Sequence, residues 1–440
     1  MTIVPPTTSE SAIAHAIEVL ARCQALSRFS EDLASLRRTF LSPPMRDCHQ
    51  AILNWLKPLN VDATVDAAGN LRALYPATTA AAPRLLIGSH LDTVPNAGIY
   101  DGPLGVVLAV TLLEELHAQN LYLPFAIELV AFSEEEGVRF GAPFLGSRAL
   151  IGALDENLLN RRDANGISVR EAIRNFGLDP AQLPASRLHP ENVLGYLEFH
   201  IEQGPILDRL GLPLAAVEAI IGQSRLSITF TGIANHAGTT PMDVRHDALA
   251  AAAAWMVAVE NEASRTPGLV ATVGVIKVQP GAANVIPREA CLTLDIRHQS
   301  DAVRADSLHT LTSRAQEIAT RRNLSLAITT LIDQPSVAMD PFLTAQIESS
   351  MRSAGCTPHR MASGAGHDAM ILAERVPSAM IFLRSPGGVS HDPAESVLPE
   401  DVARAIDCGV HLLKQLAALP EFLHSPVSRS LSQRKNSPRA

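Results

Sequence analysis

The apolar positions of residues 10–132 alternate between patterns typical of helices and patterns typical of strands. The series begins with an amphipathic helix and ends with an apolar strand that runs into the polar turn SEEEG at 133–137. Such an alternation predicts an α/β domain with a mostly parallel central sheet, in which ligands bind beyond the carboxyl ends of the strands. Helices are expected near 45–56 and 106–119, and strands near 61–65, 71–75, 84–87 and 125–132.

The middle of the chain has a different pattern. An alternating strand at 226–232 precedes a long alanine-rich helix at 245–263, and two more strands and a second helix follow. The order strand, helix, strand, strand, helix resembles a ferredoxin-like α+β unit. We therefore expect residues 214–333 to form an inserted domain.

The first pattern resumes after about residue 335. A helix at 341–355, a strand at 378–383 and a final helix from Pro399 indicate that the first domain is discontinuous. We expect it to comprise 1–213 and 334–424. The remaining segment, 425–440, is polar and lacks apolar periodicity, so it is predicted to be disordered.

Composition narrows the class of partner. A chain of 440 residues exceeds what one hydrophobic core usually serves, which agrees with two domains. The formal net charge of -9 argues against nucleic acid and anionic membranes as partners, because both require a basic face. A small-molecule partner is expected instead.

Location and redox state follow from local patterns. The first residues show no basic region followed by an apolar core, and no apolar run reaches the roughly 18 residues of a membrane span, so we expect a cytoplasmic protein. The five cysteines are scattered without a CxxC pair, which predicts reduced thiols and no thiolate zinc site. Any metal site would therefore use histidines and carboxylates.

Five candidate metal ligands stand at strand ends or in loops of the outer domain. Histidine and carboxylate together suit Zn, Mn or Co, and a bridging carboxylate would let five side chains hold two ions. A single histidine is more often a surface or core residue, so coincidence stays open and the hypothesis depends on joint placement. The candidates are His90, Asp101, Glu136, His200 and His391.

The last two glutamates of the SEEEG turn are candidates for two different roles, metal binding and proton transfer. Glu136 is the candidate ligand, and Glu135 is the candidate group for moving protons. The alternative is a solvated helix start, where carboxylates favour the positive end of the dipole. His367 follows glycines in ASGAGHDAM, for which turn chemistry and helix capping are the simpler interpretation.

Substrate contacts are expected from both domains. Arg297 would bind a carboxylate through two hydrogen bonds, His236 and Asn284 would donate to a carbonyl or oxyanion, and Gln203 would add an amide contact beside His200. Taken alone, Arg297 is equally compatible with a solvated strand end. Together these groups suit an acyl substrate that bears a carboxylate.

The motifs resemble those of one enzyme family in order from about residue 65 to 400. The chain is similar to the dinuclear-zinc amidohydrolases related to aminoacylases and carboxypeptidases, in particular the hydantoinase/carbamoylase branch. That branch includes N-carbamoyl-L-amino acid hydrolases, allantoate amidohydrolases and β-ureidopropionases. The motifs are GSHLDTV, YDGPLGV, EEGVRFGAPFLGSRAL, EFHIEQGP, ANHAGTTPMDVRHDA, NVIP, AGHDA and SHDPAE.

The resemblance implies a zinc-peptidase-like catalytic domain, and a role for each motif residue. Asp101 would bridge two divalent ions, zinc by preference with manganese or cobalt as alternatives. His90 and His200 would complete one site, and Glu136 and His391 the other. Glu135 would be the general base. His236, the oxyanion donor, would contact the substrate together with Gln203, Asn284, Arg297 and His367.

The resemblance also implies that the inserted domain binds substrate and joins two subunits into a homodimer. The expected reaction releases amino acid, ammonia and carbon dioxide from an N-carbamoyl-L-amino acid, with allantoate as the alternative ureido substrate. A dipeptidase or aminoacylase acting on N-acyl amino acids is disfavoured by His200, because those relatives typically have a carboxylate there. A non-catalytic ligand binder predicts a missing ligand or base, and none is missing.

Three positions depart from the family pattern. Ala97 and Ile99 stand where many relatives have a glycine and a basic residue, and Val138 stands where a serine is common. None of them is a ligand or the base, so the departures concern the substrate side of the site.

Overall fold

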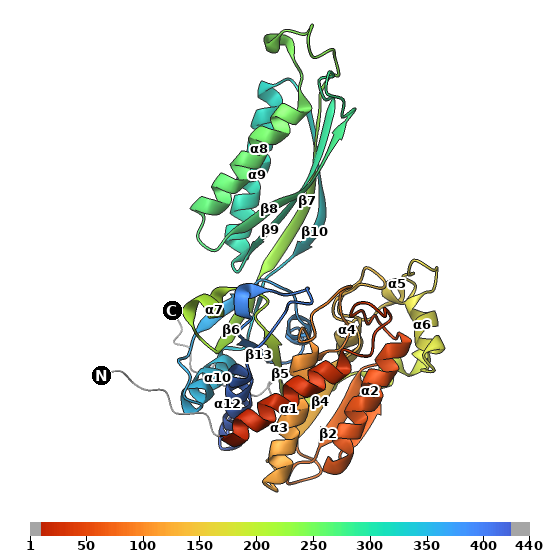
Figure 1. Cartoon of the computed structure of the whole chain (residues 1–440), viewed down its shortest axis with the longest axis vertical. Helices are drawn as coiled ribbons and strands as arrows, with labels where there is room; N and C mark the ends of the chain where they lie inside the picture. Colours follow the sequence, from red (N-terminus) through yellow and green to blue (C-terminus); the bar gives the residue numbers. More distant parts are fainter. Residues whose placement is uncertain (1–9, 424–440) are drawn as a thin grey trace, which may run out of the picture. The chain divides into compact units, whose positions relative to one another are not determined.

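The structure, a computed structural model, describes residues 10–423, and the predicted disordered segment 425–440 lies outside them. The described residues form two compact units (Figure 1), one made of residues up to Glu218 and from Met339 onward, the other of Ala219–Ala338. Both junctions lie five residues later than the 213/214 and 333/334 boundaries expected from the sequence. The physical reason at the first junction is strand β6 (Leu214–Ile220), which pairs with the large sheet instead of opening the inserted unit.

The first unit is built on a mixed sheet with a parallel centre. The order β1-β2-β4-β3-β5-β13-β6-β11 places four parallel strands, β4, β3, β5 and β13, side by side, with antiparallel strands on both sides. The strands are β1 (Asp62–Val65), β2 (Leu71–Tyr75), β3 (Arg84–His90), β4 (Ala126–Phe132), β5 (Val193–Ile201), β11 (Val337–Ala338), β12 (Arg360–Ser363), which pairs with β6, and β13 (Ser378–Leu383).

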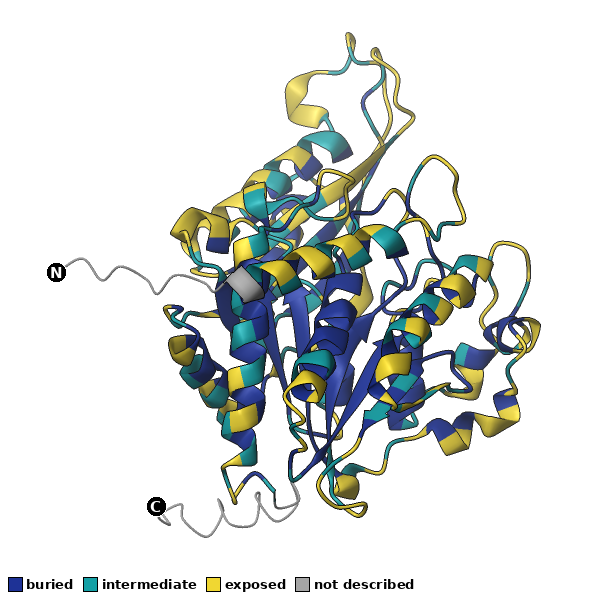
Figure 2. Cartoon of the chain, turned by 60° about the horizontal axis from the view of Figure 1, so that its bottom comes forward, coloured by how far each residue is buried: buried dark blue, intermediate teal, exposed yellow. Residues whose placement is uncertain are grey.

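The central strands have continuous apolar sequences because both of their faces are buried. Every residue of β4, β5 and β13 is buried, as expected for parallel strands covered on both faces. Figure 2 shows them beneath helices whose outer sides are exposed. The predicted α/β class with a mostly parallel sheet is confirmed.

Helix α3 (Pro103–Ala118) sits closest to this centre. It starts with proline in its first turn after Gly102, which has φ 85°, and it packs on β3 and β5. Among the described residues no helix is long and apolar enough to cross a membrane. The other helices of the unit are α1 (Glu10–Leu26), α2 (Pro43–Leu56), α4 (Leu145–Ile151), α5 (Glu156–Leu159), α6 (Val169–Asn175), α7 (Ile206–Leu210), α10 (Pro341–Ser353), α11 (Asp368–Leu372) and α12 (Pro399–Ala417).

The second unit has the expected ferredoxin-like arrangement. Its antiparallel sheet has the order β10-β7-β9-β8, and the inward side chains of β7 and β9 alternate with partly exposed ones, so one face packs on the helices. A sixth element, β10, completes the unit and was not predicted. The elements are β7 (Gly222–Thr231), α8 (Ala248–Arg265), β8 (Val270–Gln279), β9 (Glu289–His298), α9 (Asp301–Arg321) and β10 (Ser325–Gln334).

Candidate metal centre

The predicted ligands converge because the central strands are parallel. His90 ends β3, His200 lies at the end of β5, Glu135 and Glu136 follow β4, and His391 is in the loop after β13. The carboxyl ends of parallel strands meet at one edge of a sheet, where ligands of such folds bind. Together with Asp101, in the loop before α3, the five candidate ligands come from positions up to 301 residues apart in the sequence.

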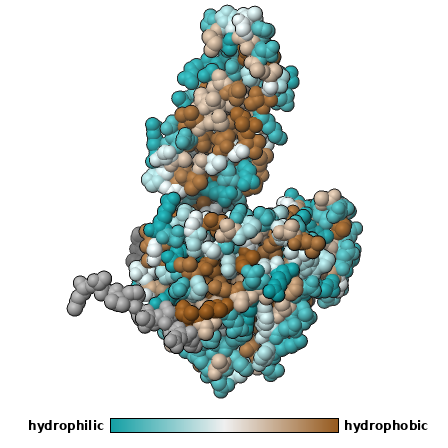
Figure 3. All heavy atoms as spheres, in the orientation of Figure 1, coloured by the Kyte–Doolittle hydropathy of each residue, from teal (hydrophilic) through white to brown (hydrophobic). Residues whose placement is uncertain are grey.

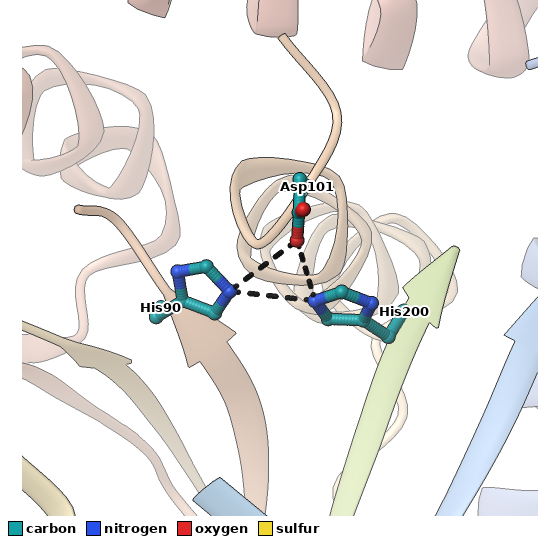
Figure 4. A group of neighbouring side chains, drawn as sticks. All are labelled: His90, Asp101 and His200. Atoms are coloured by element: carbon teal, nitrogen blue, oxygen red, sulfur yellow. Dashed lines mark hydrogen bonds and ion pairs between the residues drawn. The ribbon is translucent and has the colours of Figure 1, made fainter. Parts of the chain in front are cut away.

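Three of them form a buried triangle (Figure 4). The Nε2 atoms of His90 and His200 lie 3.4 Å apart, and Asp101 Oδ1 lies 3.6 Å and 3.1 Å from them. Asp101 Oδ1 is buried and has no hydrogen-bond partner. All three side chains are at most 5% exposed.

The tautomers of both histidines follow from their second nitrogens. His90 Nδ1 lies 3.0 Å from the carbonyl oxygen of Asp92, and His200 Nδ1 lies 2.9 Å from that of Ile201. A carbonyl only accepts, so both Nδ1 atoms carry the hydrogen, and in the neutral imidazoles that metal binding requires both Nε2 atoms present a lone pair. Two lone pairs and an orphaned carboxylate oxygen that face one another match the donor set of a cation.

The other oxygen of Asp101 faces a second group of ligands. Asp101 Oδ2 lies 3.1 Å from His391 Nε2, which in turn lies 3.5 Å from Glu136 Oε1. One ligand atom each from Asp101, Glu136 and His391 falls within 4.8 Å of the others. The carboxylate of Asp101 thus stands between two sets of nitrogen and oxygen donors.

Several carboxyl groups lie close together in this buried space, which raises the pKa of two of them. Burial raises the pKa of the Glu136 carboxyl to about 7, and the nearby Asp101 carboxylate adds to the shift. Burial also raises the pKa of Glu135 well above its usual value. Since histidine and carboxylate donors suit Zn, Mn or Co, a divalent cation fits these residues by charge as well as by donor type.

Two carboxylates that the sequence interpretation did not assign hold the site together. Asp92 Oδ1 and Oδ2 accept the backbone N–H groups of Glu135 and Glu136 at 2.9 and 3.0 Å. Glu395 Oε1 accepts those of Tyr100 and Asp101 at 2.9 and 3.1 Å. Asp92 stands in the motif GSHLDTV and Glu395 in SHDPAE, but neither motif indicates which distant backbone groups the carboxylate binds.

Gln203 lies at the centre and contacts Asp101, while its expected contact with substrate stays a prediction. It adopts a left-handed backbone conformation with φ 58°, and its Nε2 donates to Asp101 Oδ2 at 2.8 Å. Ser390 donates to the same oxygen at 3.2 Å. The amide oxygen of Gln203 is buried without a partner, so it is available as an acceptor.

His367 is buried beside His200. It is 1% exposed, its ring packs on that of His200 with centroids 4.5 Å apart, and its Nε2 lies 2.9 Å from Ser363 Oγ. Its direct contact with substrate stays a prediction.

The three candidates of the second unit do not meet in one copy of the chain. His236 and Asn284 are exposed on two loops joined by the hydrogen bond from Ala237 N to Asn284 O, 2.9 Å. Arg297 lies at the opposite end of β9, where Asp295 accepts from its Nε at 2.7 Å. From the start of the strand at 289 to 297 the separation is about 27 Å, so Arg297 and His236 of one copy cannot contact the same small molecule.

Comparison with known proteins identifies the family. A model described as peptidase family M20/M25/M40 matches residues 86–415. The chain belongs to this family. A hydantoinase/carbamoylase family amidase from Burkholderia ambifaria is 31% identical with a TM-score of 0.84, and the match covers 91% of this chain and 97% of that one. The hydantoinase/carbamoylase branch is thereby confirmed.

Curated relatives agree with this assignment. An N-carbamoyl-L-amino acid amidohydrolase from Geobacillus stearothermophilus is 40% identical over 372 residues, covering 84% of this chain and 91% of the relative. An allantoate deiminase from Arabidopsis thaliana is 38% identical over 420 residues, covering 88% and 80%. The chain is a metal-dependent hydrolase that acts on C–N bonds.

Proposed function

We propose that this enzyme hydrolyses N-carbamoyl-L-amino acids at a pair of divalent ions, releasing the amino acid, ammonia and carbon dioxide. The observation that carries the proposal is the carboxylate of Asp101, whose two oxygens face different histidines. The 40% identity to the N-carbamoyl-L-amino acid amidohydrolase of Geobacillus stearothermophilus supports the substrate class.

In this proposal Asp101 would bridge the ions. His90 and His200 would hold one ion, and Glu136 and His391 would hold the other, with zinc as the first choice and manganese or cobalt as alternatives. Bound there, the ions would activate a water molecule and polarise the scissile carbonyl.

Glu135 supplies the proton chemistry. One of its oxygens lies within 4.8 Å of ligand atoms of His90 and Glu136, and its backbone is fixed by Asp92. Its carboxylate accepts the proton that the attacking water loses and returns it to the leaving nitrogen. Glu135 is 7% exposed, so little bulk water competes for this proton.

The remaining groups orient the substrate. The orphan amide oxygen of Gln203 accepts from a ureido N–H, Arg297 binds the carboxylate, and His236 with Asn284 donates to the developing oxyanion. His367, packed on His200, faces the same centre.

We further propose that the active form is a homodimer with shared sites. Because one copy separates His236 from Arg297 by the length of β9, a partner subunit must supply one of them to each substrate. Large apolar side chains exposed on the edge strands β8 and β10 support an interface on this unit (Figure 3); they are Val270, Val275, Ile276, Ile328, Leu331 and Ile332.

Complementation tests the shared site. Glu135→Gln and His236→Ala are each expected to inactivate the enzyme, but a mixed dimer would contain one intact site formed by Glu135 of one subunit and the histidine of the other. Co-expression with two affinity tags isolates the mixed dimer. A mixed dimer as inactive as both parents would contradict a site that takes His236 from the partner subunit.

Allantoate is the second candidate, favoured by the 38% identity to the Arabidopsis thaliana allantoate deiminase. Ammonia and amine release from N-carbamoyl-L-amino acids, β-ureidopropionate, allantoate and dipeptides, with zinc, manganese or cobalt in turn, separates the candidates. Ammonia from a ureido compound that stops on chelation supports the proposal, whereas cleavage of dipeptides alone would overturn it.

A further inference from the structure

A cavity of about 450 Å³ opens beside the metal centre, entirely within the first unit. That volume lies in the range of small-molecule sites. Gln203, Ser390 and His391 form its wall on one side, and each of them contacts Asp101 Oδ2, at 2.8, 3.2 and 3.1 Å respectively. The cavity is therefore continuous with the ligands of the second candidate ion.

Apolar residues also line the cavity. Pro205 and Ile206 come from the start of α7, and Met361 and Ala362 from β12. Ile206 is 46% exposed. At Gly364 the wall has no side chain, and a Cβ built there would meet no other heavy atom within 4 Å.

The polar groups near the apolar wall are already paired. The two oxygens of Glu202 accept the backbone N–H groups of Ile206 and Leu207 at 2.7 and 2.8 Å. The N–H of Ala365 donates to the hydroxyl of Ser363 at 3.2 Å, and that hydroxyl donates to the carbonyl of Ala365 at 2.9 Å. The Glu202 carboxylate disfavours an anionic substituent here, and the side chains of Pro205, Ile206, Met361 and Ala362 offer a polar one no hydrogen bond.

We propose that this cavity receives the α side chain of the N-carbamoyl amino acid and selects uncharged, apolar side chains such as those of methionine and leucine. This inference rests on the proposed function. The carbamoyl group then lies at the polar end, against the free amide oxygen of Gln203. In allantoate a second ureido group takes the place of the side chain, and its N–H donors and carbonyl would face Ile206, Met361 and Ala362 without partners.

Steady-state kinetics of the metal-loaded full chain test the selection. We expect kcat/KM for N-carbamoyl-L-methionine to exceed that for N-carbamoylglycine by about 10- to 200-fold, the range that hydrophobic pockets give for added methylene groups. N-carbamoyl-L-aspartate and allantoate are expected to fall below N-carbamoyl-L-methionine by at least tenfold. Equal or faster cleavage of either overturns the inference while leaving a ureido hydrolase; no ammonia from any ureido compound overturns the proposed function as well.

Two variants change the cavity in opposite directions. Gly364→Val fills open space, so the methionine-to-glycine ratio of kcat/KM should fall at least tenfold, with Gly364→Ala intermediate. Ile206→Ala removes an exposed side chain and should raise the relative rate for N-carbamoyl-L-phenylalanine. Thermal unfolding of each variant checks that the fold is retained, and unchanged ratios in folded variants would place the side chain elsewhere.

Discussion

Removing the carboxylate of Glu395 should weaken metal binding although Glu395 is not itself a candidate ligand. Glu395 is 5% exposed; its Oε1 accepts the N–H groups of Tyr100 and Asp101, and its Oε2 accepts from Ser390 at 3.3 Å. It therefore ties the loop of Asp101 to the loop of His391. Gly98 lies against it, since a Cβ there would come within 2.4 Å of the carboxylate.

The expected loss of metal affinity follows from these contacts. Burial raises the pKa of Glu395 to about 7. The two backbone bonds therefore contribute about 0.5–1.5 kcal/mol each to a neutral carboxyl and about 1.5–3 kcal/mol each to the carboxylate, so together they hold the Asp101 loop with about 1–6 kcal/mol. Removing groups that orient metal ligands typically costs 10- to 100-fold in metal affinity. That loss equals about 1.4–2.7 kcal/mol, which is within what the two bonds supply.

The assay is a metal titration of the apoenzyme, read by calorimetry and by activity. Glu395→Ala should bind its weaker ion about 10- to 100-fold less tightly, lose turnover at limiting metal and regain most of it at excess, with KM nearly unchanged. Glu395→Gln, which keeps one acceptor oxygen, should lie between. Glu348→Ala is the matched control. Glu348 also accepts two hydrogen bonds, both from Arg360 at 2.8 Å, but it lies on α10, which carries none of the candidate ligands. Native metal affinity in Glu395→Ala would refute the reasoning.

Three further outcomes are expected. Glu135→Gln should retain its metals but lose about 10²- to 10⁴-fold in kcat, the usual contribution of a general base; turnover near the native rate would assign the proton transfer to another group. A chelator should abolish activity and lower the unfolding midpoint, both restored by added zinc, manganese or cobalt, and an unaffected midpoint would speak against ions that bridge distant loops. For Asp295, burial raises the carboxyl pKa, but hydrogen bonds from Arg297 and Arg225 outweigh burial and leave the pKa below its usual value. Its stabilisation is therefore present above the unfolded pKa of about 3.9 and is lost as pH falls through the folded pKa. Asp295→Asn should thus destabilise the protein to urea more at pH 7 than at pH 2, and an equal effect at both pH values would contradict the ion-pair explanation.

Local patterns in the sequence were sufficient for the fold class and for naming the candidate ligands. Continuous apolar runs predicted buried parallel strands, because a strand covered on both faces has no polar side, and β4 and β13 are buried at every position. His90 and the glutamates after β4 were placed by their position at strand ends, whereas strand β5, which carries His200, was not predicted. Strand β10 was missed, since eight of its ten residues are exposed and its apolar pattern is weak.

Tertiary structure alone decided how those residues act together. Periodicity reports which face of an element is buried, but not which distant backbone group a side chain reaches. The bond between Glu395 and the N–H of Asp101 joins positions 294 residues apart, and the division of the Asp101 oxygens between two histidine groups depends on the path of four strands. The same holds for the separation of Arg297 from His236, which is set by the length and direction of β9. The amino-acid sequence by itself determined the elements and the chemistry available, and chain folding determined the geometry in which that chemistry is used.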